Sequence, residues 1–108
     1  MRLIDHLRVP YLLEAETVEL PDGRWVRRVC YPELSGCVAE AAVVEDALSQ
    51  LERKRIQMIV RMVRDGRAPT APRPPLSDSD PIWIAKQVGI ADEDISLIER
   101  DGAAGVPA

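Results

Sequence analysis

The chain has 108 residues, of which 46% are hydrophobic and 30% are charged, and its formal net charge is −4. This composition is typical of one globular domain with an appended segment, and it excludes a disordered chain. The acidic balance disfavours nucleic-acid binding through overall charge, although a local basic patch stays compatible with it.

The sequence has no apolar run of the length that a bilayer requires, and its first ten residues lack the apolar stretch of a signal peptide. We therefore expect a cytoplasmic protein without membrane contact. Residues 1–10 predict at most one helical turn, which Pro10 ends. The only histidine, His6, is expected at the surface, because a histidine acts as a base or ligand only beside groups that orient it.

A β-hairpin is the strongest local prediction. Residues 11–20 and 24–31 carry valine, threonine, tyrosine and tryptophan, which suit strands, and they flank Asp22-Gly23, a dipeptide that favours a hairpin turn. A third strand is predicted over residues 37–41.

The stretch CYPELSGC, residues 30–37, joins the second and third predicted strands. Its proline cannot donate to a sheet, and its Ser-Gly pair permits a reversal. The cysteines at its two ends, Cys30 and Cys37, are either buried structural thiols or a disulfide or redox pair. Two thiols without a nearby histidine are too few for a zinc site.

A long helix is predicted over residues 41–66, because apolar residues recur at helical spacing, interrupted by Arg55. In its second half Ile56, Val60 and Val63 add another apolar side. Either a returning segment of the chain or a second chain has to bury that side. We expect a second chain, and so a homodimer or higher oligomer that associates through these residues.

The last third of the chain predicts a linker and two short helices. Residues 67–80 are rich in proline and favour a semi-rigid spacer. The following helices are expected over residues 81–88, with Ser79 or Asp80 as the N-cap, and over residues 92–100, with Gly102 as the stop.

The spacing of Ala85, Gly89 and Ile95 in this tail resembles the helix-turn-helix core of small repressor domains. Ser96 and Arg100 are the candidate DNA contacts on the second helix. Acidic residues open that helix, however, and would repel phosphates. The alternative is a repurposed helical pair that packs on the main domain or on a partner.

The sequence predicts no enzyme, no cofactor and no metal. It shows no carboxylate pair beside a histidine, no nucleophile with a base and no phosphate-binding glycine loop. Trp25 and Arg27, on a strand expected at an exposed edge, and Trp83, after the linker, are the candidate partner-binding residues. Packing in the core is an equally good interpretation of each.

Three segments form an ordered pattern: PELSGC at residues 32–37, EDAL at residues 45–48 at a helix start, and Gly66 followed by prolines. This pattern, spread over residues 11–76, resembles the HicB-type antitoxin family. The chain departs from the family at residues 41–43, where Ala-Ala-Val replaces Gly-Asp-Thr, so the usual helix cap is missing.

The resemblance implies an α+β fold. Residues 1–66 would form a three-stranded antiparallel sheet packed on one long helix, followed by the linker, residues 67–80, and a short helix-turn-helix-like tail, residues 81–108. It further implies a degenerate RNase H-like domain that occludes a small basic RNA-cleaving toxin (HicA-like), with operator DNA as a second target of the tail. The alternative is a non-catalytic adaptor or dimerisation module with the same domain.

Overall fold

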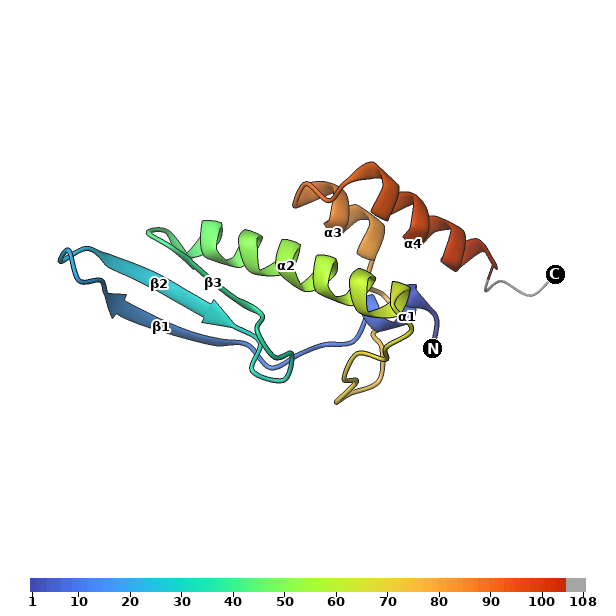
Figure 1. The fold of residues 1–108 in the computed structure, drawn as a ribbon, viewed down its shortest axis with the longest axis horizontal. Coiled ribbons are helices and arrows are strands. Elements are labelled where there is room, and N and C mark those ends of the chain that lie inside the picture. Colours follow the sequence, from blue (N-terminus) through green and yellow to red (C-terminus); the bar gives the residue numbers. More distant parts are fainter. Residues whose placement is uncertain (105–108) are drawn as a thin grey trace.

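The computed structural model describes the backbone of residues 1–104 and the side chains of residues 1–100. The fold is α+β, as the sequence predicted, with a three-stranded antiparallel sheet, one long helix and a short C-terminal helical pair (Figure 1). The strands are β1 (Glu14–Glu19), β2 (Trp25–Cys30) and β3 (Val38–Ala41). The helices are α1 (Leu3–Leu7), α2 (Val44–Arg64), α3 (Pro81–Gln87) and α4 (Asp92–Ala104).

The sheet has the order β1-β2-β3, so β2 is its middle strand and not an edge as the sequence analysis expected. The predicted hairpin joins β1 to β2. Gly23 has a φ of +86°, a conformation that glycine adopts without strain, and its N–H donates to the Leu20 carbonyl at 2.9 Å. The Leu20 N–H donates to the Arg24 carbonyl at 2.7 Å and closes the turn.

Helix α2 packs along β3 and β2, while β1 makes its main contacts with β2 alone. Val29 of β2 is fully buried in one core cluster with Ala47 and Leu51 of α2. Alanines on β3, Ala39 and Ala41, pack against this cluster, and their small side chains leave room for the helix. Figure 1 shows the consequence, because the β1–β2 hairpin extends beyond the helices at one end of an elongated molecule of 58 × 27 × 27 Å.

The second apolar side of α2 is covered by the chain's own helices. Ile56 and Val60 are 0% and 2% exposed, and Val63 is half-buried. The hydrophobic cluster that holds them also holds Ile98 of α4, and α1 packs against both α2 and α4. The expected self-association through these residues is therefore corrected, because a returning segment already buries them.

The same packing corrects the expectation for His6. This residue lies in α1 and is buried, because α1 lies between α2 and α4. A single helical turn between two helices leaves few positions at the surface. No local sequence pattern indicates this burial, because α4, which covers α1, begins only at Asp92.

The proline-rich segment 67–80 lies against the residues that follow α1. The Leu76 N–H donates to the Arg8 carbonyl at 2.9 Å, and Arg8 Nε donates to the Ser79 carbonyl at 3.1 Å. The Tyr11 hydroxyl donates to the Thr70 carbonyl at 2.6 Å. These bonds connect the first predicted segment, residues 1–66, to the proline-rich segment; the division of the chain into separate domains stays a prediction.

The tail forms the predicted pair of helices. Asp80 caps α3 by accepting from the Trp83 N–H at 3.1 Å, and Gly89, with a φ of +76°, turns the chain toward α4. Helix α4 continues through Gly102 to Ala104, so the expected stop at Gly102 is wrong. None of the helices within residues 1–104 combines the length and apolar character needed to cross a bilayer.

The start of α2 provides a direct test of helix capping. Helix α2 follows Val43, which is exposed, has an extended backbone and makes no capping hydrogen bond. We expect Val43→Ser to raise the free energy of unfolding by about 1 kcal/mol, because a serine hydroxyl accepts from a free N–H of the first turn. Urea denaturation followed by circular dichroism measures the change. Val44→Ser, one position into the helix, is the control and should bring no such gain; equal effects of the two substitutions would contradict the account.

Candidate functional site

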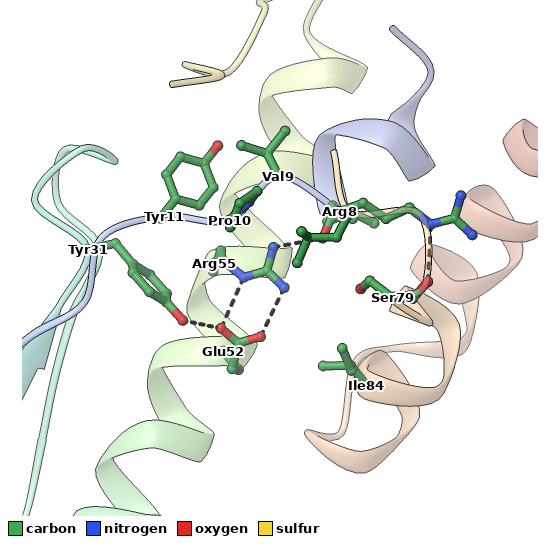
Figure 2. A pocket seen from close by; sticks show the side chains of 11 residues that line it. Arg8, Val9, Pro10, Tyr11, Tyr31, Glu52, Arg55, Ser79 and Ile84 are labelled. Carbon is green, nitrogen blue, oxygen red and sulfur yellow. Dashed lines mark hydrogen bonds and ion pairs between the residues drawn. The ribbon is translucent and has the colours of Figure 1, made fainter. Parts of the chain in front are cut away.

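One cavity lies where the segment after α1 meets α2, α3 and the proline-rich segment (Figure 2). Its volume is about 260 Å³. It is lined by Leu7, Arg8, Val9, Pro10, Tyr11, Tyr31, Glu52, Arg55, Leu76, Ser79 and Ile84. Most of these residues present apolar surface, so the chemistry of the cavity depends on the few polar groups among them.

Three of those polar groups bond to one another. Arg55 is 6% exposed, and its Nη2 and Nε donate to the two oxygens of Glu52 at 2.9 and 3.1 Å. Its Nη1 donates to the Leu7 carbonyl at 3.1 Å, and the Tyr31 hydroxyl donates to Glu52. Figure 2 shows these side chains turned toward each other. We call Tyr31, Glu52 and Arg55 the buried polar cluster.

The protonation states of this cluster follow from its geometry. Burial raises the pKa of Glu52, but the hydrogen bonds and charge of Arg55, with the bond from Tyr31, outweigh it and leave the pKa below its usual value. Burial and the neighbouring Glu52 carboxylate raise the pKa of Tyr31 far above its usual value. Neither group is poised to exchange a proton near neutral pH, so the cluster acts as an anchor between α2, α1 and the end of β2.

Sequence reasoning noted Arg55 as an interruption of the apolar stripe but did not identify its partners. The signal was present, because a charged residue at a core position needs a counter-charge, and Glu52 lies three residues earlier on the same helix face. The contribution of Tyr31 could not be found in this way, because it depends on how β2 and α2 pack.

Both cysteines are free thiols in the structure. Cys37 is buried, and its Sγ lies 3.9 Å from the Leu51 carbonyl oxygen. Burial raises the pKa of the Cys37 thiol to about 11, which favours the unreactive protonated form. Within the described residues, no group of three or more histidine, cysteine or acidic side chains comes together in a way that could hold a metal ion.

The second candidate site is a surface, which we call the outer hairpin: β1, β2 and the turn between them, residues 14–30. Trp25, which is 59% exposed, and Arg27 lie two residues apart on one face of β2. On that face the Arg27 guanidinium donates to the Thr17 hydroxyl. The structure therefore brings these two predicted partner-binding residues together.

The opposite face of the sheet is charged. Arg28 of β2 forms ion pairs with Glu16 on β1, at 3.4 Å, and with Glu40 on β3. These side chains are exposed to solvent, so each pair stabilises the fold only slightly. Glu14 lies on the same face as Glu16, at the end of β1 that is opposite to the hairpin turn.

The other predicted residues lie elsewhere. Trp83 is 60% exposed on α3, which Figure 1 shows apart from β1 and β2, so it belongs to a separate surface. Ser96 and Arg100 are exposed on α4. At the start of that helix Asp94 forms an ion pair with Arg64 of α2 at 3.0 Å.

No family model, no curated protein and no solved structure matches this chain.

The buried polar cluster predicts a large stability effect from a single substitution. Glu52→Ala leaves the buried guanidinium of Arg55 without its carboxylate, and we expect it to lower the free energy of unfolding by about 3 kcal/mol. Gln50→Ala, at an exposed position of the same helix, is the matched control and should change it by less than about 0.5 kcal/mol. Urea denaturation of both variants checks this, and similar effects would show that the ion pair contributes nothing.

The pKa of Glu52 predicts a pH dependence. Because this pKa is lowered in the folded chain, its contribution to stability is present above the ordinary glutamate pKa and is lost as the pH falls through the folded value. The difference in stability between the wild type and Glu52→Gln should therefore shrink between about pH 6 and about pH 3. A difference that stays constant over this range would contradict the assignment.

Proposed function

We propose that this chain is a non-catalytic protein-binding module of the HicB antitoxin kind, which docks on a small basic RNA-cleaving toxin and covers its active site. The observation that carries the proposal is the outer hairpin, whose strand β1 is exposed at nearly every position and has its main contacts with β2 alone. A surface of this kind is available to another macromolecule, and Trp25 and Arg27 are residue types favoured at interfaces.

Charge supports the same partner. The chain carries a net charge of −4, and β1 has the sequence EAETVE, without a basic residue. An RNA-binding protein carries a positive surface, so the two are complementary, and complementarity of this kind accelerates association and selects the partner. Blocking the RNA site then requires only steric cover, with no reaction carried out by this chain.

The proposal places the chain in the cytoplasm, where RNA is the target of such toxins. The free state of Cys30 and Cys37 agrees with a reducing compartment. No cofactor or metal takes part in the proposed activity.

A second candidate function is a protein-binding or dimerisation adaptor with the same domain. The chain's departure at Ala41-Ala42-Val43 favours it, because the uncapped start of α2 is a difference from the antitoxin pattern. Binding of operator DNA by α4 is the least supported activity. Ser96 and Arg100 are exposed, but so are Asp92 and Glu93 at the start of the helix, where they would repel phosphates.

The test is inhibition of RNA cleavage by a small basic toxin of the HicA-like kind, mixed with this chain. We expect an equimolar amount of the chain to abolish cleavage, and the double variant Trp25→Ala/Arg27→Ala to need at least about tenfold more protein, since interface hot spots contribute about 2 kcal/mol. Trp83→Ala, an equally exposed tryptophan on the separate surface, is the control and should inhibit like the wild type. Unimpaired cleavage in the presence of folded wild-type chain would overturn the proposal and leave the adaptor.

A further inference from the structure

The two edges of the sheet differ. β3 is a four-residue strand, and Lys54 of α2 donates from Nζ to the Val38 carbonyl at 3.2 Å. A short strand covered by a lysine is a common way to block unwanted pairing. β1 is a six-residue strand with no proline or lysine, and none of the described helices has its main contacts with it.

The hydrogen-bond pattern fixes which backbone groups β1 presents at its open edge. Bonded and non-bonded pairs alternate along an antiparallel ladder, and the bond from the Leu20 N–H to the Arg24 carbonyl makes that pair a bonded one. In the observed register the next pair, Glu19 with Trp25, is non-bonded, and so are Thr17 with Arg27 and Ala15 with Val29. Ala15, Thr17 and Glu19 therefore direct their N–H and carbonyl groups away from β2.

The pairing of β2 with β3 shows the same alternation. The Tyr31 N–H donates to the Cys37 carbonyl at 3.0 Å, so the adjacent pair, Cys30 with Val38, is non-bonded. The Val38 carbonyl then points away from β2, which is where Lys54 binds it. The contact observed at one edge thus supports the alternation inferred for the other.

The charge of β1 selects the occupant of its edge. Glu14 and Glu16 lie on one face of the strand and Glu19 on the other. Pairing β1 with β1 of a second copy would bring the glutamates of two copies together, which is unfavourable. An extended segment with lysine or arginine at alternate positions would instead place cations beside Glu14 and Glu16.

We propose that the open edge of β1 binds an extended basic segment of a partner protein by strand addition, so that the segment becomes a fourth strand beside Ala15, Thr17 and Glu19. This inference rests on the proposed function for the choice of a basic protein as partner. The backbone bonds supply affinity, and Glu14 and Glu16 supply selectivity for a basic segment.

The probe for the test is a synthetic peptide of about eight residues that alternates lysine and threonine, a length that spans a typical strand. Fluorescence anisotropy measures its affinity, and amide hydrogen exchange by NMR locates it. We expect the peptide to slow exchange at Ala15, Thr17 and Glu19 and to leave Glu16 and Val18, which already bond to β2, unchanged. Absence of binding, or binding without this protection, would overturn the proposal.

Two variants at one position separate the backbone from the side chain. Thr17→Pro removes the outward N–H without touching the ladder to β2, and we expect about tenfold weaker peptide binding, the equivalent of one lost hydrogen bond. Thr17→Ser keeps the outward N–H and the hydroxyl that accepts from Arg27, and it should bind like the wild type. Circular dichroism verifies that Thr17→Pro is folded; if it is not, Glu14→Lys provides the test, with binding weaker by about fivefold. Wild-type affinity in folded Thr17→Pro, or in Glu14→Lys where that variant is used, would contradict strand addition.

The outcomes for the two proposals are distinguishable. If folded Thr17→Pro blocks RNA cleavage by the HicA-like toxin as well as the wild type does, the antitoxin function stands and strand addition is wrong. If the peptide protects the β1 amides but the chain leaves RNA cleavage unaffected, strand addition stands and the antitoxin function is wrong.

Discussion

The guanidinium of Arg55 lies on the buried side of α2, and its bonds to Glu52 and to the Leu7 carbonyl hold that helix against α1. Since an unpaired buried charge is strongly unfavourable, this arrangement forms only when the start of the chain and α2 are together. Tyr31 adds the end of β2 to the same cluster. The anchor therefore fixes α2 at the β3 side of the sheet, and the returning helices α3 and α4 complete a core at that end of the molecule.

The position of α2 has a direct consequence for the sheet. A helix anchored over β3 and β2 does not cover β1, so β1 has both of its faces and its outer edge exposed, and the hairpin projects from the helices (Figure 1). Two-stranded hairpins are marginal in isolation, and exposed edges attract other strands. The absence of positive charge from β1 restricts the partners that can approach, and it favours a basic one.

Much of the local structure was predictable from the sequence, because it depends on residues close together along the chain. Asp22-Gly23 located the hairpin, the apolar period located α2, and Asp80 marked the start of α3. The sequence could not say what covers Ile56 and Val60, since a periodic pattern shows that a side is apolar but not which segment packs on it. For the site, the sequence placed Trp25 and Arg27 on one predicted strand, whereas the buried polar cluster depended on tertiary packing between Tyr31 and α2.

The most direct measurement of the central claim is residue-resolved amide hydrogen exchange on the free chain. If β1 is an open edge, protection should alternate along it, with Ala15, Thr17 and Glu19 exchanging rapidly and Glu16 and Val18 slowly. Uniformly slow exchange along β1 in the absence of any partner would show that the edge is already covered, and it would contradict the account.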